Sequence, residues 1–422
     1  IELKRKGIHY GEAEEQLLRY YRDSLGAEGG LFLYTQLYIV SNDTETRYFA
    51  NNTKLNKLFH FTWAKENNSK VNDLFEFAGV FLNPQQLLRF ITNYVVLKKK
   101  TEQLYVLRPY QYYAVERIIE KVKENSGNGY IWHTTGSGKT LTSFKASQII
   151  TRIPEVKKVL FVVDRKDLDE QTAKEFNAYS PESVDLTANT KKLVERLEGD
   201  TKLIVTTIQK LNYAISTQKY KKRIESLRDD RIVFIFDECH RSQFGLTHRN
   251  ITTFFRNTQL FGFTGTPIFA ENAYPTDGLK RTTKDLFEEC LHKYVITDAI
   301  SDGNVLRFSV EYIGRFIETN NAHEQDIAVR DIDTSEVFDT QERLEKIYSY
   351  IIKNHKKKVG SKGTAIFAVS SIDILCRYYE VFKKGYNKEH NLKVATVFSY
   401  ADNDTFIKDS DWGGVDDPDQ PY

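Results

Sequence analysis

The sequence contains little sulfur: its 422 residues include three cysteines and no methionine. Cys239, Cys290 and Cys376 lie far apart and form no CxxC pair, which argues against a disulfide framework and against a zinc site. We therefore expect a protein of a reducing compartment, the cytoplasm. A natural chain this rich in Leu, Ile and Phe is not expected to lack methionine. We expect the sequence to be part of a longer gene product, and we rely on spacings only within compact motifs.

Long apolar runs are also missing. The longest, such as "VLFVV" and "IVFIF", have the length of a strand and are far shorter than the ~20 residues that cross a bilayer, so no membrane association is predicted. An excess of one charge is missing too, because the formal net charge is only +2. A near-neutral total neither supports nor excludes a nucleic-acid partner, which needs a local basic groove rather than a basic average.

Strand and helix patterns alternate along the chain. Up to about residue 97, strand-like runs ("LFLYTQLYIVS", "TRYFAN") are mixed with helical ones ("EAEEQLLRYY", "PQQLLRFITNYVVL"). From about Leu104, amphipathic helices alternate with short apolar runs, namely "GYIWH", "KVLFVVD", "TKLIVTT", "RIVFIFDE" and "QLFGFTGTP". Strands buried on both faces have this composition, so we predict an α/β fold with a helix-covered parallel sheet. After about Leu306 a second such unit is predicted, with strands "GTAIFAVSS" and "KVATVFSYA" around the helix "IDILCRYYEVFKK".

The segment "YIWHTTGSGKTLTSF" gives the strongest functional signal. A turn between a strand ending at Trp132 and a helix opening at Lys139 lets glycine-flanked N–H groups surround phosphate oxygens at a helix N-terminus. Lys139 would reach the β- and γ-phosphates, and the Thr140 hydroxyl would hold Mg²⁺. The alternative is a chance Gly-Ser turn, and His133 stands where the eight-residue pattern usually has Gly or Ala. The predicted phosphate-binding residues are Thr135, Gly136, Ser137, Gly138, Lys139 and Thr140.

A second motif, "IVFIFDECHRSQFG", follows about a hundred residues later. An apolar strand ending in two acids places Asp237 to bind the Mg²⁺ of ATP, and Glu238 to orient and deprotonate the attacking water. Cys239 and His240 could be taken for a metal-binding pair, but no second cysteine-histidine set exists to complete it. We therefore expect His240 to sense the nucleotide and relay its state.

With "TGSGKT", "DECH" and "GFTGTP" in this order, the chain resembles superfamily 2 helicases and translocases, whose motors are two RecA-like lobes. The resemblance implies that the third motif, residues 264–267, couples hydrolysis to movement on nucleic acid. It also implies an upstream glutamine that reads the adenine. The segment "RPYQYYAVERI" offers Gln111, with Arg108 and Tyr110 close by. "VVDRKDLDEQT" and "VTTIQKL" fall where the first lobe of that family grips the strand backbone.

The residues of several longer segments narrow the resemblance to one family within this superfamily. "RPYQYYAV", "WHTTGSGKTLTS", "VDRKDLDEQT", "FDECHRSQFG", "FGFTGTPIF" and "YVITDAISDGNVL" look like the restriction (R, or HsdR) subunit of type I restriction-modification enzymes. This family implies three parts: the C-terminal part of a PD-(D/E)xK nuclease domain over residues 1–97, a complete first RecA-like lobe over 98–305, and a partial second lobe over 306–422.

The opening segment "IELKRKG" resembles the end of that nuclease motif. Glu2 and Lys4 are two apart on a strand, so their side chains leave the same face. A carboxylate there can hold the nuclease Mg²⁺ while the ammonium stabilises charge on the attacked phosphate. Gln16 and Tyr20 share one side of a helix and match the QxxxY element of the family. Taken alone, "ELK" is a common triplet at exposed strand ends.

The resemblance implies ATP-dependent translocation on double-stranded DNA coupled to endonucleolytic cleavage. The cofactors would be ATP and Mg²⁺. The partners would be double-stranded DNA and the methyltransferase (modification) and specificity subunits of a type I complex. One alternative is a superfamily 2 DNA helicase or translocase without nuclease activity, and another is a nucleotide-gated binding protein. Because we find no late arginine motif between residues 363 and 422, we expect residues 1–422 alone to bind ATP but to hydrolyse it slowly.

Overall fold

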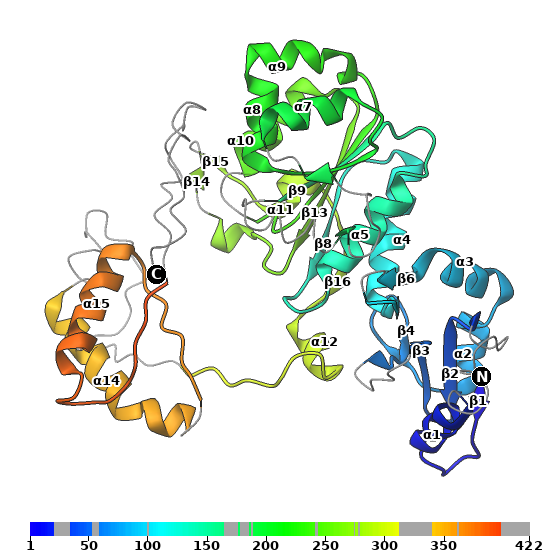
Figure 1. The fold of residues 1–422 in the computed structure, drawn as a ribbon, viewed down its shortest axis with the longest axis horizontal. Coiled ribbons are helices and arrows are strands. Elements are labelled where there is room, and N and C mark those ends of the chain that lie inside the picture. The colour runs from blue at the N-terminus through cyan, green and yellow to red at the C-terminus, as the bar shows by residue number, and fades with distance from the viewer. Residues whose placement is uncertain are drawn as a thin grey trace, which may run out of the picture. The chain divides into compact units, whose positions relative to one another are not determined.

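The chain forms two compact units, Ile1–Glu311 and Tyr312–Tyr422, in a computed structural model (Figure 1). The structure describes residues 1–20, 34–52, 59–98, 101–163, 176–177, 185–186, 189–240, 244–273, 275–276, 279–311, 340–360 and 363–397. The predicted boundary near residue 97 lies within the first unit, so the division into three domains stays a prediction. The backbone-gripping segment predicted at 162–172 lies outside the described residues from 164 onward.

A seven-stranded sheet with only parallel pairings forms the centre of the first unit. Its order is β10-β11-β9-β12-β13-β8-β16. Five of its strands are the apolar runs picked out in the sequence, so the predicted parallel sheet is confirmed. In chain order the strands are β8 (Gly129–His133), β9 (Lys158–Val163), β10 (Asp185–Leu186), β11 (Leu203–Thr207), β12 (Ile232–Phe236), β13 (Thr258–Thr264) and β16 (Cys290–Tyr294).

Helices cover both faces of this sheet (Figure 1). Along β9, Val159 and Phe161 join the core that contains α4 (Pro109–Glu124) and α5 (Lys139–Ile150). Leu160 and Val162 instead join the core of the opposite face. That second core is formed with α7 (Thr190–Glu198), α8 (Ile208–Ser216) and α10 (Phe244–Phe254). The period of two along each strand supplies apolar side chains to both layers, which explains the nearly continuous apolar runs.

A smaller, three-stranded sheet lies at the N-terminal end of the first unit. Strand β1 (Glu2–Leu3) pairs in parallel with β2 (Leu37–Ser41), and β2 pairs antiparallel with β3 (Thr46–Ala50). Helix α1 (Gly11–Tyr20) packs on this sheet through Ala13 and Leu17. The same cluster contains the buried side chains of Tyr38, Val40 and Phe49.

Along the chain, a short hairpin, two helices and a second hairpin follow this sheet and precede α4. They are β4 (Trp63–Ala64), β5 (Lys70–Val71), α2 (Leu74–Phe81), α3 (Pro84–Tyr94), β6 (Val95–Lys98) and β7 (Gln103–Val106). The prediction of one helix over 84–97 was wrong for its last residues. There the β-branched Val95 and Val96 pair with β7 as an antiparallel strand, because a partner strand is available.

The N-terminal part and the first lobe share one hydrophobic core. Trp63 is fully buried and its ring lies 4.6 Å from Phe81 and 5.4 Å from Tyr112 of α4. Tyr48 of β3 donates a hydrogen bond of 2.8 Å to the carbonyl of Leu107.

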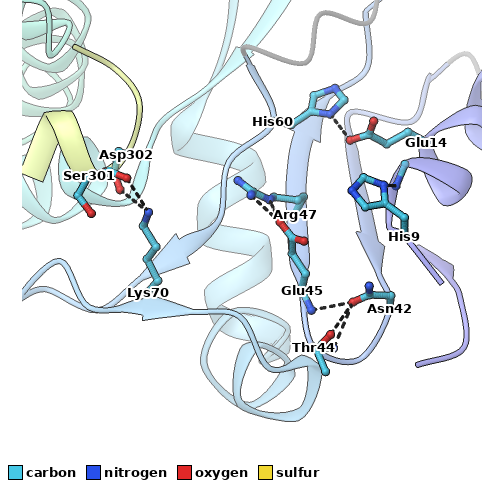
Figure 2. A network of polar contacts seen from close by, with 11 residues as sticks. His9, Glu14, Asn42, Thr44, Glu45, Arg47, His60, Lys70, Ser301 and Asp302 are labelled. Carbon is cyan, nitrogen blue, oxygen red and sulfur yellow. Dashed lines mark hydrogen bonds and ion pairs between the residues drawn. The ribbon is translucent and has the colours of Figure 1, made fainter. Parts of the chain in front are cut away.

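Two ion pairs add to this junction. Lys70 contacts Asp302 at 3.0 Å, beyond the end of α12 (Ile296–Ser301) (Figure 2), and Arg117 pairs with Glu66. The described residues of the segment 1–97 are thus packed against the lobe.

The remaining described elements of the first unit are short. They are α9 (Gln218–Arg223), η4 (Glu225–Leu227), η5 (Ala270–Asn272), β14 (Pro275–Thr276), β15 (Leu279–Lys280) and α11 (Thr283–Phe287). In the described part of the chain, no helix has both the length and the apolar composition needed to cross a bilayer.

The second unit contains two described helices, α14 (Gln341–Val359) and α15 (Ile372–Gly385). They pack together through a small core that includes Tyr348 and Phe382. The prediction of strands at "GTAIFAVSS" and "KVATVFSYA" was wrong for their described residues, 363–371 and 393–397, which form no strand. Ile366 is 99% exposed and Val397 is 94% exposed. A strand needs a hydrogen-bonded neighbour, and no strand pair is described in this unit.

Gly262 of β13 provides a test of the sheet packing. A Cβ there would lie 2.6 Å from Sγ of Cys239 and 2.9 Å from the Phe287 ring. We expect Gly262→Ala to lower the free energy of unfolding by about 1–3 kcal/mol, because an added methyl overpacks a filled core. Gly79→Ala in α2 is the matched control, since a Cβ at Gly79 meets nothing within 4 Å. Urea unfolding curves in which the two variants lose equal stability would contradict this account.

Candidate functional site

The turn between β8 and α5 has the backbone shape of a phosphate loop. Gly136 and Gly138 have φ angles of 80° and 77°, in the left-handed region that favours glycine. A Cβ at Gly138 would lie 2.6 Å from the amide nitrogen of Gln111, whereas a Cβ at Gly136 would meet open space. The buried Ser137 hydroxyl has no hydrogen-bond partner among the described residues. This open face, with an unpaired hydroxyl beside it, fits a triphosphate.

Two side chains at the start of α4 form hydrogen bonds with this loop and stabilise it. The Tyr110 hydroxyl and the Gln111 side-chain amide each donate a hydrogen bond of 2.9 Å to the carbonyl of Ser137. The Gln111 carbonyl oxygen accepts the backbone N–H of Arg108 at 3.0 Å. Gln111, predicted to read the adenine, therefore contacts the phosphate loop in this structure and holds it to α4.

Arg108 lies at the junction with the N-terminal part. Its guanidinium lies 4.7 Å from the centre of the Phe61 ring and donates a hydrogen bond to the side chain of Asn304. The structure therefore places this predicted nucleotide-binding residue between residue 61 and the segment that follows α12.

Three predicted motifs meet at the carboxyl edge of the sheet. Lys139 of the phosphate loop lies 3.4 Å from Oε1 of Glu238, which follows β12. The other oxygen of Glu238 lies 3.5 Å from Nδ1 of His240, and this nitrogen lies 2.9 Å from the hydroxyl of Thr264 at the end of β13. The three loops converge because β12, β13 and β8 are neighbours in the sheet and all run in one direction.

Close backbone contacts complete this meeting point. A Cβ at Gly265 would lie 3.4 Å from the carbonyl of His133 and 3.6 Å from the hydroxyl of Thr135. The Thr264 hydroxyl accepts the N–H of Thr266 at 3.1 Å. The third motif therefore packs directly against the base of the phosphate loop.

Asp237 and Thr140 supply oxygen atoms of the kind that Mg²⁺ prefers. Asp237 follows β12 directly, and its Oδ1 accepts the N–H of Glu238 at 3.0 Å. Glu238 itself has a positive φ of 47°, an uncommon conformation for a residue with a side chain. Thr140 lies in the first turn of α5. A carboxylate and a hydroxyl near a triphosphate loop fit an ATP-bound Mg²⁺.

Sequence reasoning missed a buried histidine pair behind the loop. His133 and His292 of β16 are both buried, and their nitrogens Nε2 and Nδ1 lie 2.9 Å apart. Next to them, Tyr294 stacks on Tyr110 with ring centres 3.6 Å apart. The segment "YVITDAISDGNVL" begins at the last residue of β16 and supported the family resemblance. It did not indicate that this strand lies beside β8.

The histidine pair predicts how stability depends on pH. Burial lowers the pKa of His133 well below its ordinary value and that of His292 to about 4. Between about pH 6.5 and 4 the unfolded chain binds more protons, so the free energy of unfolding should fall as the pH falls, by about 3 kcal/mol for His292 alone. Denaturant unfolding at pH 7.5, 6 and 4.5 should show a shallower fall for His292→Gln; parallel curves would contradict the assignment.

The four predicted nuclease residues also come together. Lys4 lies 3.3 Å from Glu2 and donates a hydrogen bond to the side-chain carbonyl of Gln16 on α1. The Gln16 amide in turn donates to the hydroxyl of Tyr20, one turn later. A carboxylate, an ammonium and a polar helix face therefore form one continuous group. The carboxylate of Glu2 is a suitable Mg²⁺ ligand.

Comparison with protein families agrees with this order of motifs. Residues 1–57 match the type I restriction enzyme R protein N terminus, and residues 110–346 match the SWI2/SNF2 ATPase family. Residues 361–420 match the type I restriction enzyme subunit R domain 3.

Two relatives of known class agree as well. The type I restriction enzyme SsaAORF53P endonuclease subunit of Staphylococcus saprophyticus is 49% identical over 408 residues, 96% of this chain and 43% of its own. The SauMRSORF196P endonuclease subunit of Staphylococcus aureus (strain MRSA252) is 47% identical over the same shares. Among solved structures, a nuclease-deletion mutant of the type ISP restriction-modification enzyme LlaGI in complex with a DNA substrate mimic is 19% identical. Its TM-score is 0.37, over 61% of this chain and 23% of that one.

The parallel sheet, the phosphate loop and the acidic pair after β12 define an ATPase lobe of the RecA-like kind found in superfamily 2 and SWI2/SNF2 motors. The chain belongs to the family of type I restriction enzyme endonuclease (R) subunits. It spans 43% of the length of the two relatives described above.

Proposed function

We propose that this chain provides the ATP-driven motor lobe and part of the nuclease of a type I restriction enzyme. In this proposal, ATP hydrolysis drives movement along double-stranded DNA, and the nuclease cuts the DNA. The observation that carries the proposal is the contact of Lys139 with Glu238 and, through His240, with Thr264. These residues come from three loops that adjacent parallel strands bring to one edge of the sheet, where a single ligand can contact all of them.

The residues around the phosphate loop would have different roles in ATP hydrolysis. Lys139 would leave Glu238 for the phosphates when ATP binds, which frees that carboxylate to accept a proton from the attacking water. Bound Mg²⁺, held by Thr140 and Asp237, would neutralise charge on the phosphate oxygens. His240 bridges Glu238 and Thr264, so it can transmit the change at the carboxylate to the third motif.

The nuclease residues have separate roles. Glu2 would hold a Mg²⁺ ion, and Lys4 would stabilise the negative charge that develops on the attacked phosphate. Gln16 accepts a hydrogen bond from Lys4, so it would hold the ammonium in place. Tyr20 extends this group toward solvent, since its side chain is partly exposed.

We also propose the partners that the family implies. Double-stranded DNA would be the substrate, with a specificity subunit to recognise the site and a methyltransferase (modification) subunit to modify it. A cytoplasmic location is consistent with the free thiols of Cys239, Cys290 and Cys376. This chain should therefore contact mainly the sugar-phosphate backbone of the DNA and have little base specificity of its own.

The test uses the full-length protein assembled with modification and specificity subunits. We expect steady phosphate release that requires double-stranded DNA carrying the recognition site, and cleavage that requires ATP. Equal phosphate release with and without DNA would contradict the motor, and cleavage at an unchanged rate without ATP would contradict the coupling.

Salt dependence gives a further prediction for the full-length subunit alone. Its affinity for double-stranded DNA should fall about 10³-fold or more between 50 and 200 mM salt, as expected when ~6 or more phosphates are contacted. Fluorescence anisotropy with two unrelated duplexes measures both the slope and the sequence preference. A shallow slope, or a strong preference for one duplex, would contradict backbone-dominated binding.

A further inference from the structure

Helix α1 carries two of the proposed nuclease residues, so its rotation about its own axis matters. Successive residues of a helix point about 100° apart. A turn of the helix by one residue would therefore swing Gln16 and Tyr20 away from Lys4. The apolar contacts of Ala13 and Leu17 with the sheet keep the helix close, but such contacts are not directional.

A polar pair lies on the buried side of this helix. Oε1 of Glu14 lies 2.7 Å from Nδ1 of His60, and the two side chains are only 4% and 5% exposed (Figure 2). The imidazole stacks on Phe49 of β3, with ring centres 3.9 Å apart and an interplanar angle of 14°. Nε2 of His60 has no hydrogen-bond partner among the described residues, so Glu14 is the polar anchor of this ring.

Burying such a pair is costly, because a carboxylate and an imidazole both lose their water. An apolar pair of the same volume would hold the helix on the sheet at lower cost. What the polar pair adds is direction, since a hydrogen bond requires a defined distance and angle. Glu14 and Gln16 are two residues apart, so they point to nearly opposite sides of α1. Fixing Glu14 on one side therefore fixes Gln16 on the other.

The segment that leads into α1 is held in place as well. The Asn42 side chain, in the turn between β2 and β3, donates a hydrogen bond of 2.8 Å to the carbonyl of Ile8. Nδ1 of His9 accepts the N–H of Gly11 at 3.1 Å. These contacts hold the entry to the helix, and the Glu14–His60 pair sets its rotation one turn later.

We propose that Glu14 and His60 are positioning residues of the nuclease. They hold α1 at the rotation in which Gln16 accepts a hydrogen bond from Lys4 and donates one to the hydroxyl of Tyr20. This inference rests on the proposed nuclease function of Glu2, Lys4, Gln16 and Tyr20. It assigns a role in cleavage to two buried residues that would act through the orientation of α1.

The experiment uses the full-length protein with its modification and specificity subunits, and measures DNA cleavage and ATP hydrolysis separately. We expect Glu14→Ala to lower the cleavage rate about 10- to 100-fold, the loss expected from a misplacement of about 1 Å, with ATP hydrolysis unchanged. Glu14→Gln should retain most of the cleavage, because an amide can still form a hydrogen bond with the imidazole. Glu15→Ala is the matched control, since Glu15 is an exposed residue of the same helix.

A double-variant comparison separates positioning from loss of folding. If Glu14 acts through Gln16, then Glu14→Ala should have little further effect in a protein that already carries Gln16→Ala. Loss of folding would instead reduce cleavage by the same factor in both backgrounds, and its extent would follow the thermal unfolding curve. Equal factors in the two backgrounds would overturn the proposal, as would wild-type cleavage by Glu14→Ala.

Lys4→Ala is measured beside these variants. If Lys4→Ala keeps full cleavage, the proposed nuclease function itself fails. If Lys4→Ala abolishes cleavage while Glu14→Ala and His60→Ala cleave like the wild type, only the positioning role fails.

Discussion

Replacing Glu238 with Gln should lower DNA-stimulated phosphate release by about 10²–10⁴-fold, the usual contribution of a general base. The amide retains the size and one hydrogen-bonding oxygen of the carboxylate, but it cannot accept a proton from water. ATP binding should persist, because the phosphate loop and Lys139 are unchanged. Release of labelled phosphate by the full-length enzyme, measured beside ATP binding at equilibrium, separates the two effects.

The matched control is Glu225→Gln, which changes an exposed acid of η4 in an ion pair with Arg228. It should hydrolyse ATP like the wild type. A nucleotide-gated binding protein would show no steady DNA-dependent phosphate release to lose. Hydrolysis by Glu238→Gln within a few-fold of the wild type would remove Glu238 from the proposed chemistry.

Replacing Lys4 with Ala should lower DNA cleavage by about 10²–10³-fold, the loss typical when one group that stabilises a developing negative charge is removed. ATP hydrolysis should be unchanged, because Lys4 contacts Glu2 and Gln16 on the small sheet and not the phosphate loop. The measurement is linearisation of a circular DNA with one unmethylated site, at saturating ATP and Mg²⁺.

Lys6→Ala is the control for Lys4→Ala, because Lys6 is an exposed lysine two residues further on. Cleavage should be lost in one variant and kept in the other. If both variants cleave normally while hydrolysing ATP, Glu2 and Lys4 are surface residues. The chain would then be better described as a superfamily 2 translocase whose nuclease residues lie elsewhere.

The first lobe was predictable because its signals are local. Strand β8, the turn after it and the start of α5 are contiguous in the chain, and glycines at 136 and 138 meet a conformational need that other residues meet only with strain. Strands buried on two faces are apolar at nearly every position, and β9 and β12 could be recognised for this reason.

The errors arose where the neighbours of a segment decide its structure. Val95 and Val96 continued a helical pattern, yet they form a strand because β7 is there to pair with them. The apolar run containing Ile366 had the composition of a strand, but the described part of its unit supplies no strand beside it. The same limit applies to His60, whose role depends on Glu14, 46 positions away.

The sequence by itself determined the α/β class, the family, and the identity of the residues in the phosphate loop and the acidic pair, since each depends on a short stretch of backbone chemistry. Only the tertiary structure decided that Lys139, Glu238 and Thr264 meet, that Gln111 braces the loop, and that Glu14 pairs with His60. Contacts of this kind follow from strand order and helix rotation, which depend on how distant parts of the chain fill one core.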